Sequence, residues 1–312
     1  MKTATTKTKH SHNKKLIIGT LCAIGAAVCY GTNPLARFLY AEGMNIPSVL
    51  FWRFGLAWVI VALVMLFRAF SPLAASRESL RVSRREFLTL SALGLLFVFS
   101  SATLYTSFSL MPSGIASTIL FTYPVMTAVI MSLFFRERAT LPTIVSIVLS
   151  LAGVALLSFN DDGGTFSPLG ILLVLISALT YALYIIVVDK SPLQMSSFKI
   201  NFYVLFYCAL GNLVYGLLTG QPLMLPPTPT ACFWVGWLAV VPAIMALVMM
   251  VYAAKYLGST PTAILGALEP TTAVLIGVFV FSEPFSPRLF LGIVLVLAAV
   301  TLVVLAKARH KA

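Results

Sequence analysis

One short segment occurs twice in the chain, as YPVMTAVIMSLFFRE at residues 123–137 and as EPTTAVLIGVFVFSE at residues 269–283. The two copies lie 146 residues apart, and at this offset twelve of the 46 positions from 113 to 158 are identical. The apolar composition explains some of the leucine and valine matches, but not the pairing of Pro124 with Pro270 or the shared final glutamate. The repetition indicates that the chain consists of two related halves.

The composition places both halves in a membrane. Of the 312 residues, 60% are hydrophobic and 10% are charged, and the mean hydropathy is +0.99. A soluble domain carries about 25% charged residues, so this composition excludes an ordinary soluble enzyme, a disordered chain and a DNA-binding module. A helix needs about 20 apolar residues to cross the hydrocarbon core. Ten segments of this kind are found, at residues 16–39, 48–67, 87–109, 114–134, 141–159, 168–188, 200–218, 231–254, 262–281 and 287–306.

The basic residues predict how these spans are oriented. With the N-terminus inside the cell, 18 of the 21 Lys and Arg residues fall in cytoplasmic segments. The outer loops hold two, Arg37 and Arg288, and Arg53 lies within the second span. Because basic residues are retained on the cytoplasmic side, we expect both termini in the cytoplasm. The net charge of +12 then follows from orientation in the lipid bilayer, and we expect no nucleic-acid partner.

The two halves span residues 16–159 and 168–306, each with five predicted helices. Because five is odd, the second half enters the membrane from the opposite side. The predicted fold is an all-α membrane protein of ten transmembrane helices, arranged as two inverted-topology five-helix repeats, which is typical of secondary transporters. We expect a periplasmic linker at 160–167 and basic cytoplasmic tails at 1–15 and 307–312. A duplicated scaffold without transport is the alternative.

Several short motifs follow one another in a fixed order along the two halves. They are YGTNP at 30–34, WRF at 52–54, YTSFSL at 105–110, YP at 123–124, FRER at 135–138, YAAKYL at 252–257, LEP at 268–270 and FSEP at 281–284. Together they resemble the EamA-type branch of the drug/metabolite transporter superfamily, over residues 16–306. The resemblance implies a permease of the cytoplasmic membrane in which four helices of each half surround a cavity and the fifth is peripheral. It also implies a substrate such as an amino acid or another small metabolite, often exported. Tyr123 departs from the repeat, because the equivalent position in the second half is Glu269.

Pro124 and Pro270 fall near the centres of the fourth and ninth spans. Proline inside a helix removes a backbone hydrogen bond and costs about 3 kcal/mol or more, which frees the carbonyls of Leu120 and Gly266. Broken helices at matching points of two repeats indicate a substrate site. A kink that serves only packing is the alternative.

Glu269 is the only acidic side chain deep within a predicted span. A charge there costs about 2.5–3.5 kcal/mol on insertion scales, so we expect the carboxylate to face the bundle interior. Three roles are open: binding a substrate amine, coupling transport to protons, or bracing the bundle by hydrogen bonds.

Other polar residues are candidates for the same cavity. Its expected aromatic lining consists of Tyr30, Tyr105, Tyr123, Tyr181 and Tyr184. Near one carboxylate, this lining would suit a small amphipathic or zwitterionic solute. Asn33, next to Pro34, forms a second polar and helix-breaking point. Arg53 lies about one turn inside its span. Two roles are open for it: contact with the substrate, or a role as an interfacial anchor or partner of Glu42, which its position favours.

The remaining residues give no sign of catalysis. The three histidines lie in the tails, and the four cysteines lack the spacing of a metal site. We therefore expect no catalytic, cofactor-binding or metal-binding residue, and no enzyme. An ATP-driven pump is excluded because no GxxxxGK[ST] motif occurs.

The predicted function is secondary transport of a small metabolite by alternating access, with protons as a candidate coupling ion, in the inner membrane. A carrier of drug-type or sugar-type solutes, and a non-transport scaffold or embedded enzyme, are the alternatives. Phosphorylated solutes are disfavoured, because they need basic residues near the midplane, whereas Arg53 and Lys255 lie near span ends. The residues do not decide between a monomer and a homodimer.

Overall fold

The computed structural model describes residues 2–70, 81–107, 110, 116, 119–135, 140–158, 167–191, 193, 195–266, 268–281 and 287–309. The first half contains α1 (Lys2–Tyr30), the 3-10 helix η1 (Asn33–Ala36), α2 (Arg37–Ala41), α3 (Ile46–Phe70), α4 (Arg84–Ser107), α6 (Tyr123–Phe135) and α7 (Leu141–Ser158). The second half contains α8 (Pro168–Lys190), α9 (Ser197–Leu218), α10 (Pro229–Leu238), the π-helix η2 (Ala239–Met245), α11 (Ala246–Leu257), α12 (Ser259–Leu265), α13 (Leu268–Phe281) and α14 (Pro287–Arg309). Every regular element in these ranges is a helix.

The predicted all-α membrane class is confirmed. Within the described ranges, seven helical stretches are long and apolar enough to cross a membrane: Asn13–Ala41, Ile46–Phe67, Arg84–Ser107, Pro168–Lys190, Ser197–Leu218, Pro229–Leu257 and Ser259–Phe281. The helices α7 and α14 hold shorter apolar stretches, and the fourth predicted span lies partly outside the described residues. The count of ten spans therefore stays a prediction.

Local sequence explains where three helices of the second half begin, α8, α9 and α10. Ser167, Ser196 and Thr228 each stand at an N-cap, where the hydroxyl accepts a hydrogen bond from a backbone N–H in the first turn. Pro168 and Pro229 follow two of these caps, in the first turn, where proline's missing N–H has no helical partner to lose.

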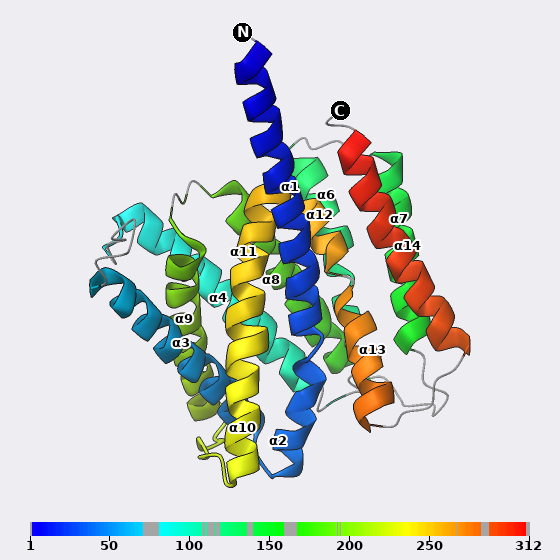
Figure 1. The fold of residues 1–312 in the computed structure, drawn as a ribbon. Coiled ribbons are helices and arrows are strands. Elements are labelled where there is room, and N and C mark those ends of the chain that lie inside the picture. The colour runs from blue at the N-terminus through cyan, green and yellow to red at the C-terminus, as the bar shows by residue number, and fades with distance from the viewer. Residues whose placement is uncertain are drawn as a thin grey trace.

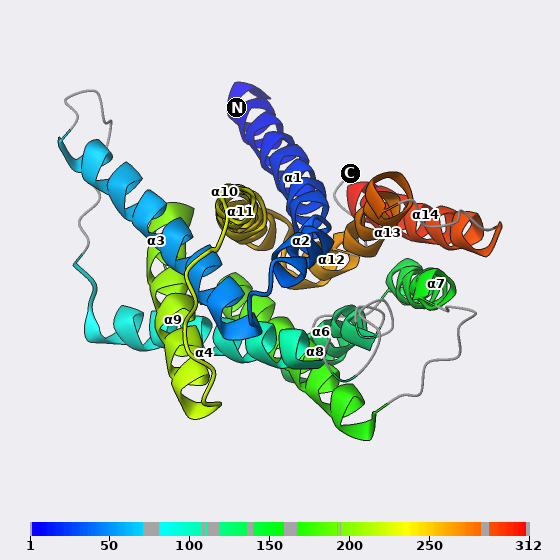
Figure 2. The same cartoon turned by 90° about the horizontal axis from the view of Figure 1, so that it is seen from below.

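The helices of the two halves pack across each other. Helix α1 contacts α11, α3 contacts α9, α4 contacts both α8 and α9, and α6 contacts α8. In Figure 2, α3, α4 and α9 gather on one side of the bundle, whereas α7 and α14 lie on the other. These last two helices pack against each other at the edge, and α1 extends beyond the bundle at its N-terminal end (Figure 1). The core is thus built from both halves, with α7 and α14 outside it.

The contact between α3 and α9, the second helix of each predicted repeat, is antiparallel. Gly216, near the end of α9, lies against Pro47 at the start of α3. Further along α3, the Trp58 ring contacts Phe206 and Phe202, with centroids 5.6 and 5.8 Å away. Residue numbers therefore rise along α3 as they fall along α9, so these two equivalent helices run in opposite directions.

Four predicted spans are interrupted in the described residues, and in the fourth a turn at residues 121–122 precedes α6. In the first span, α1 ends at Tyr30, and a turn at residues 31–32 leads into η1 and α2. In the ninth, α12 ends before Gly266 and α13 begins at Leu268. In the eighth, η2 widens the helix around the buried Pro242, an interruption that was not predicted from the sequence. π-Helical turns are rare within α-helices, and those that occur are often found at functional sites.

The position of the two repeat prolines corrects one expectation. Pro124 and Pro270 are not in the middle of a helix but in the first turns of α6 and α13, where proline is tolerated. The Gly266 carbonyl is not left free, because it accepts a hydrogen bond of 2.9 Å from the Glu269 N–H. The chain therefore breaks before each proline rather than kinking at it.

Candidate functional site

Glu269 stands in the first turn of α13, beside the break in the ninth span, and its side chain is partly buried. The negative charge of Glu269 acts on the phenol groups of Tyr30, Tyr123 and Tyr181. Because these tyrosines belong to the buried core, the carboxylate lies on the inner side of α13. This agrees with the orientation expected for an ionisable group inside a membrane bundle.

Tyr181 of α8 is the centre of an aromatic group. Its ring meets Tyr30 edge-on at 6.4 Å and Tyr123 edge-on at 4.9 Å, and lies parallel to Tyr184 at 6.2 Å. The hydroxyls of Tyr30, Tyr123 and Tyr184 are buried and have no hydrogen-bond partner among the residues that the structure describes. Buried hydroxyls are usually hydrogen-bonded, so these three tyrosines give the apolar core a place with unused polar groups.

Two glycines let the helix ends close around Glu269. A methyl group on Gly31, directly after α1, would collide with Thr272 and lie 2.7 Å from the Glu269 carbonyl oxygen. A methyl group on Gly266 would collide with the Tyr123 hydroxyl. The absence of a side chain at both positions is what allows α1, α6 and α13 to meet.

Arg53 of α3 is buried, with 3% of its side chain exposed. Its Nη1 donates a hydrogen bond of 2.8 Å to the Tyr105 hydroxyl, and its guanidinium lies 4.9 Å from the centre of the Phe54 ring. The positive charge of Arg53 acts on Glu269. The favoured interpretation of Arg53 as an interfacial anchor or a partner of Glu42 does not match this placement, because Arg53 is buried and donates to Tyr105, whereas Glu42 accepts a hydrogen bond from Thr228.

We call these residues the Glu269 cluster: Glu269, Tyr30, Tyr123, Tyr181, Tyr184, Arg53 and Tyr105. The structure thus brings together seven of the ten predicted site residues. Asn33 lies in η1, which packs against α13, and its Oδ1 is buried without a partner within the described part of the chain. Pro270 is buried next to Glu269, whereas the side chain of Pro124 lies outside the described residues.

Three polar residues on one face of α9 were not among the predicted site residues. Asn201, Cys208 and Asn212 are all fully buried. Cys208 lies in the neighbourhood of Arg53 and Tyr30. Both side-chain polar atoms of Asn201 and the Oδ1 of Asn212 lack hydrogen-bond partners in the described chain. Their spacing of seven and four residues places them on one helical face, a signal that the sequence offered.

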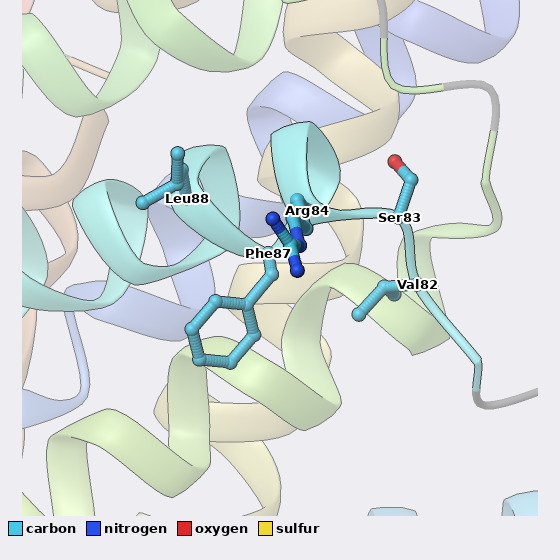
Figure 3. Close-up of a pocket in the computed structure, with 5 residues that line it drawn as sticks. All are labelled: Val82, Ser83, Arg84, Phe87 and Leu88. Carbon is cyan, nitrogen blue, oxygen red and sulfur yellow. The ribbon is translucent and has the colours of Figure 1, made fainter.

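Other parts of the surface do not contribute to this site. A hollow at the start of α4 is lined by Val82, Ser83, Arg84, Phe87 and Leu88, none of which belongs to the Glu269 cluster (Figure 3). The described residues contain no group of three His, Cys, Asp or Glu side chains that could hold a metal ion.

A bundle of apolar helices, with interrupted spans meeting at a carboxylate among core tyrosines, is the architecture of a secondary membrane transporter. The sequence matches the EamA-like transporter family twice, over residues 17–159 and 168–305, and the chain therefore belongs to this family. It is a multi-pass membrane protein of the drug/metabolite transporter superfamily.

Individual relatives agree with this assignment. An uncharacterized transporter of Archaeoglobus fulgidus is 27% identical over 272 residues, which cover 87% of this chain and 96% of the relative. An uncharacterized transporter of Clostridium kluyveri is 21% identical over 89% of this chain and 90% of its own length. The uncharacterized inner membrane transporter YedA of Escherichia coli K12 is 26% identical over 63% of each chain.

A crystal structure of another protein shares the fold. It superposes with a TM-score of 0.71 at 18% sequence identity, over 94% of this chain and 99% of the other.

Proposed function

We propose that this protein is a secondary transporter that exports a small zwitterionic or amphipathic metabolite, such as an amino acid, across the inner membrane. The observation that carries the proposal is the position of Glu269. Its carboxylate stands among buried tyrosines where the interrupted first and ninth spans meet. The similarity to the inner membrane transporter YedA supports the location.

The proposed architecture has ten spans in two inverted repeats, at 16–159 and 168–306. The linker at 160–167 lies in the periplasm, and the tails at 1–15 and 307–312 lie in the cytoplasm. The antiparallel packing of α3 on α9 supports the inversion, because equivalent helices of inverted repeats run in opposite directions. The placement of 18 of the 21 basic residues in cytoplasmic segments supports the orientation.

Alternating access requires contacts at each end of the bundle that open in turn. At the end that we assign to the outside, Trp52 donates a hydrogen bond of 2.7 Å to the Met224 carbonyl. At the opposite end, Lys255 donates one of 2.9 Å to the Met195 carbonyl, and Lys199 donates one of 2.8 Å to the Arg81 carbonyl. These few bonds between loops and helix ends are the contacts that we propose to exchange during the cycle.

Glu269 is proposed to bind the amine of the solute and to exchange that amine for a proton. A carboxylate attracts an ammonium group only in its ionised form, so a proton and the amine compete for it. Binding of an amine-bearing solute is therefore expected to weaken as the pH falls. The surrounding tyrosines provide ring faces that attract cations.

The experiment begins with a screen of deletion and overexpression strains for altered resistance to toxic concentrations of metabolites. The solute identified is then tested for counterflow in proteoliposomes at two pH values. Glu269→Gln is expected to lower counterflow by about tenfold or more, in keeping with the loss of a charge-assisted bond, and to abolish the pH dependence. Glu86→Gln, at the exposed start of α4, is the matched control and is expected to transport normally. A Glu269→Gln protein with the wild-type rate and pH dependence would refute the proposal.

A further inference from the structure

Arg53 is a buried charged residue with a polar atom that the described part of the chain leaves without a hydrogen bond. A guanidinium is charged at every physiological pH, and an arginine inside a membrane segment costs about 2.5–3.5 kcal/mol on insertion scales. Only 3% of the Arg53 side chain is exposed, and its Nε is buried without a hydrogen-bond partner among the described residues. A buried charge is expected to be paired, so the unused Nε–H indicates a partner that the described residues do not supply.

The protein fixes the rest of the guanidinium. Nη1 donates to the Tyr105 hydroxyl at 2.8 Å, and the group lies 4.9 Å from the centre of the Phe54 ring. These contacts come from two helices, α3 and α4, and hold the group in place. The Nε edge of a guanidinium presents two parallel N–H donors, a spacing that fits the two oxygens of a carboxylate. A pre-positioned guanidinium with this edge unused is suited to bind an anion.

The positive charge of Arg53 acts on Glu269, a carboxylate in the same cluster. The described residues show no ion pair between the two. Two unlike charges in one apolar site attract each other strongly, and a solute that carries both charges can satisfy both. One acidic and one basic side chain give the site no net charge, which suits a zwitterion better than a phosphate with two negative charges.

We propose that the Nε edge of Arg53 binds the carboxylate of the transported solute, and that this solute is an amino acid whose amine is held at Glu269. This inference rests on the proposed function and adds to it the group that recognises the carboxylate. Arg53 thereby becomes the residue that distinguishes an amino acid from the corresponding amine. A transporter with Glu269 alone would accept both.

Purified full-length protein in detergent provides the test. Its thermal stabilisation is measured with each of the protein amino acids and with the matched amines, such as 2-phenylethylamine for phenylalanine and 3-methylbutylamine for leucine. Inorganic phosphate and glucose 6-phosphate are added as anionic probes. The wild type is expected to bind at least one amino acid about tenfold or more tightly than its amine, the ratio that a charge-assisted hydrogen bond gives.

Variants then separate Arg53 from a general effect on folding. Arg53→Gln is expected to weaken binding of the amino acid by about tenfold or more, and to leave the affinity for the amine within about threefold of the wild-type value. Arg53→Lys keeps the charge without the Nε edge and is expected to be intermediate, which keeps the test informative if Arg53→Gln does not fold. Arg37→Gln, an exposed arginine above the Phe281 ring, is the matched control with unchanged preference.

Three results would overturn the inference. Equal binding of amino acids and amines by the wild type would remove the role of Arg53 while leaving the role of Glu269 in transport intact. The same follows if Arg53→Gln weakens amine and amino acid equally. Stabilisation by phosphate or glucose 6-phosphate, with none by any amino acid, would show that Arg53 binds a different anion.

Discussion

Tyr123 and Glu269 occupy equivalent positions in the two halves, 146 residues apart, and the fold brings them into one cluster. The Tyr123 hydroxyl lies against Gly266, three residues before Glu269, and the charge of Glu269 acts on that phenol. One repeat thus supplies the carboxylate and the other supplies a phenol at the matching place. The chemistry of the site is asymmetric although its architecture is repeated.

This contact predicts how Gly266→Ala will behave. The backbone at Gly266 is right-handed helical, so alanine is acceptable there, and the cost comes from the collision with the Tyr123 hydroxyl. We expect a loss of about 1–3 kcal/mol, typical of overpacking, measured as a lower thermal unfolding midpoint. Removing the hydroxyl in the Gly266→Ala/Tyr123→Phe double variant is expected to restore part of the loss. A double variant that loses the sum of the two single effects would show that the contact is absent.

Gly31→Ala is predicted to be damaging because rigid groups surround it. An added methyl group meets the Thr272 side chain and the Glu269 backbone carbonyl, neither of which can move without shifting α13. We expect destabilisation of about 1–3 kcal/mol and a loss of transport. Gly236→Ala, on α10, is the matched control, because a methyl group there meets nothing within 4 Å. Equal unfolding midpoints for the two variants would argue against the close approach of α1 to α13.

The serine pair between α4 and α8 is predicted to contribute little to stability. Ser177 donates a hydrogen bond of 2.7 Å to the Ser100 carbonyl, and the Ser100 hydroxyl donates one of 3.2 Å to the Ser177 carbonyl. Such bonds inside membrane bundles average about 0.6 kcal/mol. Ser100→Ala and Ser177→Ala are each expected to lower the unfolding free energy by about that amount and to leave counterflow intact. A loss several times larger would place this pair among the residues that determine the fold.

The proposed orientation predicts the outcome of reporter fusions. Green fluorescent protein at the C-terminus is expected to fluoresce, because it folds in the cytoplasm. Alkaline phosphatase inserted after Gly164, in the proposed linker, is expected to be active, because it requires the periplasm. Active phosphatase at the C-terminus would place that end of the chain in the periplasm and contradict the proposed orientation.

The sequence was sufficient to predict the helical class, the family and most of the cluster, because the signals are local. Long apolar segments predict spans, and a lone carboxylate such as Glu269 cannot face lipid cheaply. The repeat predicted breaks near Pro124 and Pro270, although the chain breaks a few residues earlier, so that each proline falls in a first turn.

What the sequence could not predict depends on contacts between helices. Arg53 stands at a depth from which its long side chain could reach either water or the core, and only the position of Tyr105 on α4 decides for the core. The burial of Asn201 and Asn212 depends on how α9 is rotated against its neighbours. The sequence around Pro242 does not distinguish the π-helical turn found there from an ordinary proline kink.

The most direct measurement asks whether the Glu269 position is reached by water. Glu269→Cys and Phe279→Cys are made on a background in which Cys22, Cys29, Cys208 and Cys232 are replaced, and both are treated with a charged, membrane-impermeant methanethiosulfonate. Phe279, on the same helix, is 81% exposed on the outside of the bundle and serves as the lipid-facing control. We predict that the Glu269→Cys protein reacts and the Phe279→Cys protein does not. If the Glu269→Cys protein resists the charged reagent and reacts only with a lipid-soluble maleimide, position 269 faces the acyl chains and the proposed transport site does not exist.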